Sequence, residues 1–242
     1  MKNKIVELLE TLKFKGMLTA LDHQIALAEN GTATPQIIYN LLQEELRFRQ
    51  ERSMQSRLHN AKLPWDWTLN SFPFLKQPDI NKNQIMTLAG LDFMQRGENI
   101  ILHGKTGVGK SGLAVGLLRQ ALTAGFRGRF YDVQHLLDDL YASLADRTTT
   151  KLLNALCRYD ILLLDELGYL TLTKEQMNAF FKLMKERYES GKSTIITTNL
   201  EPEDWYNLLK PKDMVEALLD RLYHRCIVIN ITGKSLRDDS GK

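Results

Sequence analysis

The sequence is short of the features that mark several classes of protein. It has 2 cysteines among 242 residues, too few for a scaffold held together by disulfides. Its 15 glycines exclude a collagen-like chain, and its 43% of hydrophobic residues excludes a wholly disordered one. No uninterrupted apolar segment has the length of a membrane-spanning helix, so no membrane partner is expected. These absences leave a soluble globular protein with enough residues for one large domain and a smaller appendage.

The N-terminus and the cysteines predict a cytoplasmic protein. Lysines precede the first apolar residues, but Glu7 and Glu10 interrupt those residues, so no signal-peptide core forms. Cys157 and Cys226 lie in separate apolar patterns without the paired spacing of metal ligands. They are therefore expected to be buried thiols in a reducing compartment.

The positive charge of the chain is concentrated in one segment. The formal net charge is only +3. Within residues 47–62, however, a single carboxylate, Glu51, faces five cations, which are Arg47, Arg49, Arg52, Arg57 and Lys62. Such side chains on a helix can contact DNA phosphates with little base selectivity. A solvated helix face has the same composition, so both interpretations stay open at this point.

The first part of the chain is predicted to be helical. Apolar residues recur at helical spacing within residues 5–12 and 18–28, which indicates two short helices. Thr34 is a suitable N-cap and Pro35 a suitable first helical residue, so a third helix is expected to start there and to reach residue 63.

An aromatic segment follows these helices and marks the expected domain boundary. Residues 64–78 contain two tryptophans and two phenylalanines, which makes the segment too apolar for a free tether. We expect it to pack on the domain that follows. The predicted organisation is a helical DNA-binding or partner domain at residues 1–66 and a nucleotide-binding domain at residues 67–242.

Beyond residue 80, short apolar segments alternate with amphipathic ones. The five predicted strands are residues 100–102, 129–131, 161–164, 194–197 and 226–229. The third of them is uniformly apolar, as is typical of a strand covered on both faces. Strands that alternate with helices predict an α/β fold with a five-stranded parallel sheet flanked by helices.

A phosphate-binding loop directly follows the first of these strands. The complete pattern is formed by Gly104, Lys105, Thr106, Gly107, Val108, Gly109, Lys110 and Ser111. Glycines at these positions let backbone N–H groups point at phosphate oxygens at the start of a helix. Lys110 is expected to reach the β- and γ-phosphates of a nucleotide, and the Ser111 hydroxyl is expected to ligate Mg²⁺.

Polar residues end two further strands at the same edge of the predicted sheet. Asp165 and Glu166 close the third strand, where Asp165 would hold Mg²⁺ and Glu166 would orient and deprotonate the attacking water. Asn199 follows the fourth strand and would hydrogen-bond the γ-phosphate or that water. Taken alone, each of these residues is also typical of an ordinary turn, and only the phosphate loop favours the catalytic interpretation.

Three arginines near the C-terminus are candidates for further contacts with the nucleotide. Arg221 lies on a helix before the fifth strand, where it either acts on the nucleotide of a neighbouring subunit or pairs with Asp220 or Glu216. The roles of Arg225 and Arg237 stay open, since either side chain can equally be a solvated cation.

The order of these motifs resembles the IstB/DnaC-like family of AAA+ ATPases, in particular its IstB branch of insertion-sequence transposition helpers. The resemblance covers nearly the whole chain. It rests on residues 61–64, 96–102 with the loop that follows, 163–169, 193–199, 220–222 and 233–237.

The resemblance implies an ATP- and Mg²⁺-dependent ATPase that forms homo-oligomers on double-stranded DNA. It further implies that the protein remodels the DNA and recruits or stimulates a partner transposase, with hydrolysis controlling release. Arg221 would match the arginine finger of the family and Asn199 its first sensor. The sequence departs from the family pattern at Lys105, where proline is common, at Ser111, where threonine is common, and at Leu236, where an aromatic residue is usual.

Two rival functions share the same loop. A replicative-helicase loader would have nearly the same ATPase core and would differ in its N-terminal region. A small-molecule kinase would need a mobile lid with clustered arginines and would be a monomer, whereas Asp165 and Glu166 favour water as the acceptor.

Overall fold

The computed structural model describes residues 1–168, 173–201, 204–205 and 212–237. The chain forms two compact units, Met1–Ser56 and Arg57–Lys242. The division between them lies inside the helix α3 (Thr34–Ala61).

The first unit consists of α1 (Lys2–Thr11), α2 (Lys15–Glu29) and most of α3, as the helical spacing predicts. Helices α2 and α3 run antiparallel, because Asn40 Nδ2 donates to Gln24 Oε1 near one end of α2 while Glu45 contacts Gly16 at the other. A Cβ on Gly16 would lie 2.5 Å from a backbone oxygen of α3, so the two helices cross in close contact at this glycine.

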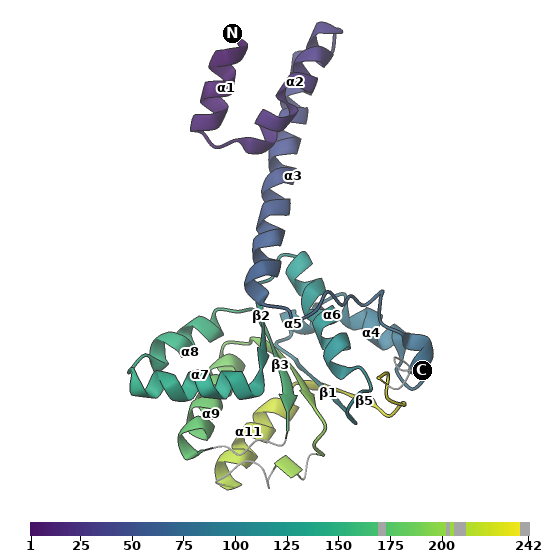
Figure 1. Ribbon diagram of the computed structural model, residues 1–242, viewed down its shortest axis with the longest axis vertical. Helices are drawn as coiled ribbons and strands as arrows, with labels where there is room; N and C mark the ends of the chain where they lie inside the picture. The colour runs from purple at the N-terminus through teal and green to yellow at the C-terminus, as the bar shows by residue number, and fades with distance from the viewer. Residues whose placement is uncertain (169–172, 202–203, 206–211, 238–242) are drawn as a thin grey trace. The chain divides into compact units, whose positions relative to one another are not determined.

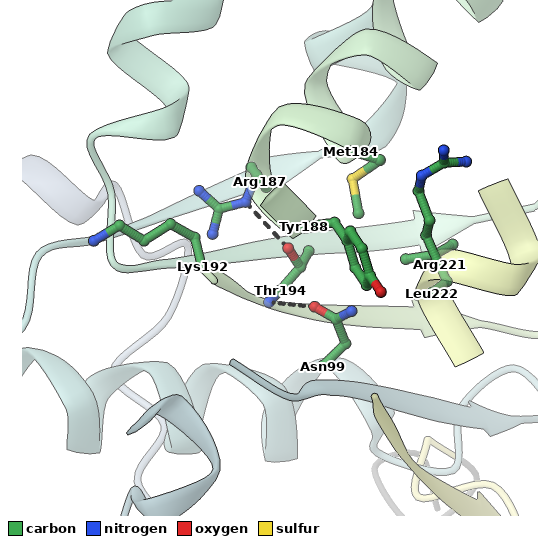
Figure 2. Close-up of a pocket in the computed structure, with 8 residues that line it drawn as sticks. All are labelled: Asn99, Met184, Arg187, Tyr188, Lys192, Thr194, Arg221 and Leu222. Atoms are coloured by element: carbon green, nitrogen blue, oxygen red, sulfur yellow. Dashed lines mark hydrogen bonds between the residues drawn. The ribbon is translucent and has the colours of Figure 1, made fainter. Parts of the chain in front are cut away.

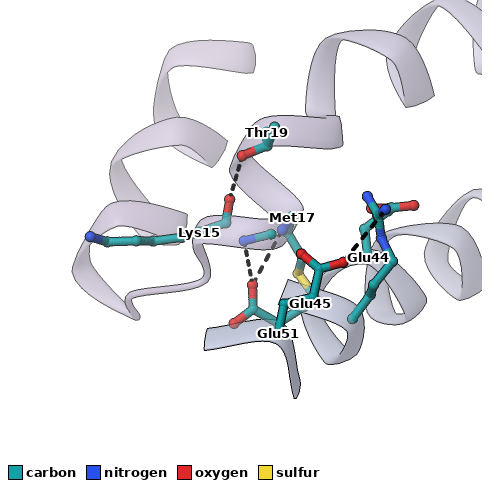
Figure 3. A network of polar contacts seen from close by, with 8 residues as sticks. Lys15, Met17, Thr19, Glu44, Glu45 and Glu51 are labelled. Carbon is teal, nitrogen blue, oxygen red and sulfur yellow. Dashed lines mark hydrogen bonds and ion pairs between the residues drawn. The ribbon is translucent and has the colours of Figure 1, made fainter. Parts of the chain in front are cut away.

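A buried carboxylate fastens the start of α2 to α3 (Figure 3). Glu45 Oε2 accepts the backbone N–H groups of Gly16 at 2.7 Å and Met17 at 3.2 Å, and Arg49 Nε donates to its Oε1 at 2.7 Å. Burial raises the pKa of Glu45, but the hydrogen bonds from Arg49, Met17 and Gly16 together lower it by more. The pKa of Glu45 therefore lies below its ordinary value. Glu45 thus supplies the negative charge that a helix N-terminus favours.

The second unit is built on a five-stranded sheet, and this confirms the predicted fold class. The strands are β1 (Asn99–Gly104), β2 (Gly128–Asp132), β3 (Ile161–Leu167), β4 (Ser193–Thr198) and β5 (Cys226–Ile231). Their order across the sheet is β2-β3-β4-β1-β5, and all neighbouring pairs are parallel. Parallel pairing brings the carboxyl ends of all strands to one edge, where ligands of such sheets bind.

Helices cover both faces of this sheet (Figure 1). They are α4 (Lys82–Leu88), α5 (Asp92–Gln95), α6 (Lys110–Thr123), α7 (Val133–Ala145), α8 (Thr149–Cys157), α9 (Lys174–Glu189) and α11 (Lys212–His224), with a short 3₁₀ turn, η1 (Phe74–Lys76), before α4. The apolar spacing in the sequence does not predict α4, α5 or α8, because helices this short leave too few turns for a clear apolar repeat.

Alternate residues of the strands supply two separate cores. Ile100 and Leu102 of β1 pack with α4, α5 and α6, whereas Ile101 between them packs with α7, α8, α9 and α11. The period of two in a strand sends neighbouring side chains to opposite faces. A strand that is apolar at every position, such as the start of β3, is therefore buried from both sides.

The aromatic segment before η1 packs on the second unit, as predicted. Two glycines of α6 make room for it, since a Cβ on Gly112 would lie 2.7 Å from the Trp67 ring and a Cβ on Gly116 would lie 2.8 Å from Leu69. Phe72 is buried in the same core. The segment therefore lies directly on the helix that begins in the phosphate loop.

The two cysteines are less buried than the sequence predicts. Cys157 and Cys226 are free but only partly buried, because both lie at the ends of their elements, where cover from neighbouring helices is incomplete. Burial still raises the pKa of Cys226 to about 12.

Among the described residues, no helix combines the length and the apolar character needed to span a membrane.

Candidate functional site

The phosphate loop joins the carboxyl end of β1 to the start of α6. Gly107 and Gly109 have φ values of 86° and 98°, a region that residues with a side chain rarely adopt. A Cβ on Gly104 would lie 2.3 Å from the Ile231 carbonyl oxygen of β5, so only glycine fits there. The loop thus has the backbone conformation in which N–H groups at a helix N-terminus bind phosphate.

Lys110 is held over this loop by backbone carbonyl groups. Its Nζ donates to the Gly104 oxygen at 2.6 Å and to the Lys105 oxygen at 2.8 Å. Burial lowers the pKa of Lys110 below its ordinary value, while the negative charges of Asp165 and Glu166 act in the opposite direction. An ammonium group has three donors, so Lys110 keeps capacity for a phosphate oxygen.

Asp165 lies beside Ser111, as the magnesium prediction requires. Asp165 is only 4% exposed, and the Ser111 hydroxyl lies near enough to influence its pKa. Burial raises the pKa of Asp165 and the charge of Glu166 adds to this, whereas the hydrogen bond from Thr197 and the nearby Ser111 hydroxyl lower it. A hydroxyl and a carboxylate oxygen are the hard donors that Mg²⁺ prefers alongside phosphate oxygens, so these residues fit that ion.

Glu166 differs from its neighbour in exposure and in backbone conformation. Its side chain is exposed, and its φ value of 62° is left-handed. Its backbone N–H donates to Thr197 Oγ1 at 2.9 Å, and Thr197 Oγ1 donates to Asp165 Oδ1 at 2.6 Å. Thr197 is a site residue that the sequence analysis passes over, because a threonine inside an apolar strand is indistinguishable from an ordinary strand residue.

Asn199 follows β4 and contacts the segment that follows β3. A Cβ on Gly168 would lie 2.4 Å from Asn199 Oδ1, so the amide occupies the space that a side chain at position 168 would need. The described residues thus bring Asn199 to the same edge of the sheet as Asp165 and Glu166.

The segment after β5 also lies on the phosphate loop. The Leu236 N–H donates to the Gly107 oxygen at 2.8 Å, and Arg237 lies near enough to Lys110 to lower the pKa of that lysine. Gln77 Nε2 donates to the Lys234 oxygen and holds this segment against the region before α4. Arg237 therefore lies near the loop, and its role toward a nucleotide stays a prediction.

Arg221 lies at the opposite end of the sheet from the phosphate loop. It lines a pocket with Asn99 and Thr194 (Figure 2), which lie at the amino ends of β1 and β4. About 16 Å of strand separates the two ends of β1. In the described part of the chain Arg221 forms no ion pair with Asp220 or Glu216; it donates to the Ala217 oxygen at 2.7 Å and lies over the Phe181 ring.

Arg187 is a buried cation of the same region that the sequence analysis does not single out. It is 1% exposed, and its guanidinium donates to the backbone oxygens of Leu156, Tyr159 and Ser193 and to Thr194 Oγ1. Burial lowers its pKa to about 10. All of these partners belong to α8, β4 or the loop before β3, so Arg187 links these elements internally.

The basic segment of α3 is partly neutralised. Arg47 forms ion pairs with Glu44 at 2.6 Å and Glu51 at 3.9 Å, and Arg49 pairs with Glu45. The charge count of the segment therefore overstates its positive potential.

The other predicted phosphate contacts of α3 have varied surroundings. Arg57 belongs to the second unit and donates to the Leu122 oxygen of α6 at 2.8 Å. Arg52 and Lys62 are exposed, and Lys62 has a left-handed φ of 54° directly after the helix. DNA binding by these five residues stays a prediction.

Sequence comparisons relate the chain to proteins of bacterial insertion sequences. The family model described as "IstB-like ATP binding protein" matches residues 7–241. The ATP-binding protein of insertion sequence IS21 from Pseudomonas aeruginosa is 40% identical over 81% of this chain and 74% of its own length. The ATP-binding protein of insertion sequence IS232 from Bacillus thuringiensis is 31% identical over 98% of this chain and 96% of its own length.

Solved structures agree with the fold. The DnaC helicase loader is 26% identical and superposes with a TM-score of 0.57 over 71% of this chain and 99% of its own. AMPPCP-bound DnaA from Aquifex aeolicus is 19% identical, with a TM-score of 0.58 over 70% of this chain and 51% of its own, and shows the fold alone. With a phosphate loop on a parallel five-stranded sheet and a family match over nearly its whole length, this chain belongs to the IstB-like ATP-binding family and has the AAA+ P-loop fold.

Proposed function

We propose that this protein is a Mg²⁺-dependent ATPase that assembles on double-stranded DNA and presents that DNA to a partner transposase. The observation that carries the proposal is the meeting of Lys110, Ser111, Asp165 and Glu166 at the carboxyl end of the sheet. A phosphate-binding lysine, two hard oxygen donors and one exposed carboxylate are the groups that nucleotide hydrolysis requires.

Each residue has a distinct task in this proposal. Lys110 binds the β- and γ-phosphates, and Ser111 with Asp165 would hold the metal ion. When bound, Mg²⁺ would neutralise charge on the phosphate oxygens. Glu166 orients the attacking water and accepts its proton, which its exposed carboxylate favours. Asn199 donates a neutral hydrogen bond at the same edge.

Arg221 is assigned to the nucleotide of another subunit. It lies beside Asn99 and Thr194 at the amino ends of their strands, so it is too far from the loop of its own chain. A cation that stabilises the transition state from a neighbouring molecule makes hydrolysis depend on assembly. The proposed homo-oligomer follows from this dependence.

The DNA and transposase roles rest on kinship and on α3. The relatives named above are ATP-binding proteins of insertion sequences, elements whose movement requires a transposase acting on DNA. On α3, Arg52 is exposed and forms no ion pair with a described residue, so it is the candidate there with most freedom to reach a phosphate.

The test separates ATP hydrolysis from ATP binding in a single variant. Glu166→Gln is expected to bind ATP with unchanged affinity, to hydrolyse it at least a hundredfold more slowly and to stay longer on duplex DNA, because the proton acceptor is lost. Glu175→Gln, on the exposed first turn of α9, is the matched control. Normal turnover by Glu166→Gln would remove Glu166 from the mechanism.

A helicase loader is the second candidate, since the DnaC helicase loader matches over almost its whole length. Gel shifts with duplex and single-stranded DNA over a salt series distinguish the two functions. Tighter binding to duplex, weakening steeply with salt, supports the transposition helper. A preference for single strands supports the loader.

A further inference from the structure

Thr197 is a buried residue of β4 that contacts both acidic residues of the proposed hydrolytic site. It is 0% exposed, so it reaches neither solvent nor substrate. Its Oγ1 donates to Asp165 Oδ1 at 2.6 Å and accepts the Glu166 N–H at 2.9 Å. A hydroxyl has one proton to donate and lone pairs to accept with, so one atom links the side chain of Asp165 to the backbone of Glu166.

The contact arises from an irregularity in the pairing of β3 with β4. The register changes from the pair Leu164 and Ile196 to the pair Leu167 and Thr198. Asp165 and Glu166 on β3 therefore both face the single residue Thr197 on β4, which is the arrangement of a β-bulge. Bulges redirect side chains, and here the result is a buried Asp165 next to an exposed Glu166.

The bulge needs support, because Glu166 has a left-handed backbone. A φ of 62° costs a residue with a side chain free energy, and such conformations persist only where the surroundings fix them. The hydrogen bond from the Glu166 N–H to Thr197 is a contact of this kind. The adjacent Thr198 hydroxyl adds a second one, since it donates to the Leu167 oxygen beyond the bulge.

We propose that Thr197 is a positioning residue for ATP hydrolysis, which holds Glu166 in its left-handed conformation and fixes the oxygen of Asp165 beside Ser111. The proposal rests on the proposed function, because Thr197 is taken to position Glu166 and Asp165, two residues that act in that function. Thr197 acts through Glu166 and Asp165, and it has no contact of its own with the nucleotide.

Amide hydrogen exchange of the full-length protein tests this role without any hydrolysis. In Thr197→Val, a change that keeps the shape and removes the hydroxyl, the Glu166 amide is expected to exchange about tenfold faster than in the wild type. Thr197→Ser keeps the hydroxyl and is expected to retain the wild-type rate. Ser193→Ala is the matched control, because Ser193 is buried on the same strand and its hydroxyl has no partner among the described residues.

Steady-state kinetics then tests the consequence for catalysis. Thr197→Val is expected to lower kcat about a hundredfold with KM and the affinity for a non-hydrolysable ATP analogue unchanged, since misplacement of a catalytic group affects the chemical step. Thr197→Ser and Ser193→Ala are expected to stay within about twofold of the wild type. If Thr197→Val does not fold, Thr197→Ala replaces it in both experiments.

The outcomes separate the two proposals. Unchanged exchange of the Glu166 amide in a folded variant without the hydroxyl overturns the positioning role, and so does an equal loss of turnover in Thr197→Ser. A wild-type protein that hydrolyses no ATP would overturn the proposed function, while the exchange experiment would still report whether Thr197 holds Glu166.

Discussion

The two ends of the sheet in the second unit each contain a cation and a threonine of β4, yet they differ in how completely these groups are paired. At the amino end, Arg187 donates to three backbone oxygens and to Thr194, and it is almost fully buried. At the carboxyl end, Lys110 donates to two backbone oxygens and is only partly buried, with Asp165 close by.

This difference separates structural from chemical roles for groups of the same kind. A buried charge whose hydrogen bonds are all made within the chain links elements together and has nothing left for a ligand. A partly buried charge that keeps donors in reserve is placed to bind something from outside the chain. The distinction predicts which substitutions affect stability and which affect nucleotide chemistry.

The largest effect on turnover is expected from replacing Arg221. This residue lies at the amino end of the sheet, but we assign it to the nucleotide of another subunit. Arg221→Ala should bind ATP normally and lose about a thousandfold of its DNA-stimulated turnover, because an arginine supplied in trans contributes roughly that much. Turnover is measured by phosphate release.

Mixing two variants tests whether Arg221 acts on the nucleotide of a neighbouring subunit. Arg221→Ala protein retains an intact loop, and Lys110→Ala protein retains Arg221, so a mixture should recover part of the turnover that each lacks alone. Arg158→Ala, at the exposed C-cap residue of α8, is the control and should stay near the wild type. Absence of recovery in mixed oligomers would contradict a site shared between chains.

Arg187→Met should have the next largest effect, and on stability alone. The change leaves four oxygens in the interior without their donor, and a loss of about 3 kcal/mol in the free energy of unfolding is expected. Urea denaturation measures it, with Arg158→Met at an exposed position as the control. An unchanged midpoint would show that paired buried cations in this sheet are dispensable.

Lys110→Ala should show the opposite behaviour. We expect affinity for a fluorescent ATP analogue to fall at least about a hundredfold, because charge-assisted hydrogen bonds to phosphate are lost. The midpoint of urea denaturation should change little, since Lys110 is only partly buried. Lys105→Ala, an exposed change in the same loop, controls for general disturbance of the loop. Unchanged affinity of Lys110→Ala would overturn the assignment of the loop.

Sequence reasoning could predict the carboxyl end of the sheet far better than the amino end. The loop is an unbroken segment whose own pattern predicts phosphate binding, and Asp165 and Glu166 are neighbours at the end of one strand, where the presence of the loop favours their catalytic interpretation. Thr197 contacts residues about thirty positions away, and Arg187 joins residues at that separation to others six and seven positions away. Both roles therefore depend on strand register and helix packing.

The ion pairs that reduce the positive charge of α3 are also hard to predict from the sequence, although part of the pattern is local. Glu44 and Glu45 lie three and four residues before the arginines with which they pair, a helical spacing that is visible in the sequence. A count that starts at residue 47 excludes both carboxylates. What no local pattern shows is that Glu45 also accepts the first N–H groups of α2, because that contact needs the fold of the whole first unit.

Glu45 is a paired, buried charge in the first unit, and its replacement is expected to have the smallest effect of the changes considered. Its folded pKa is lowered below the ordinary value of 4.5, so its contribution to stability is complete above pH 4.5 and is lost as the pH falls through the lower folded pKa. Glu45→Gln should therefore cost about 1 kcal/mol at pH 7, and this difference from the wild type should shrink steadily below pH 4.5. Exchange protection of the α2 amides measures it, and Glu44→Gln, at a more exposed ion pair, should change protection by only a few tenths of that amount. A difference that persisted unchanged at pH 3 would mean that the second acceptor oxygen of Glu45, which the amide lacks, and not the negative charge holds α2 against α3.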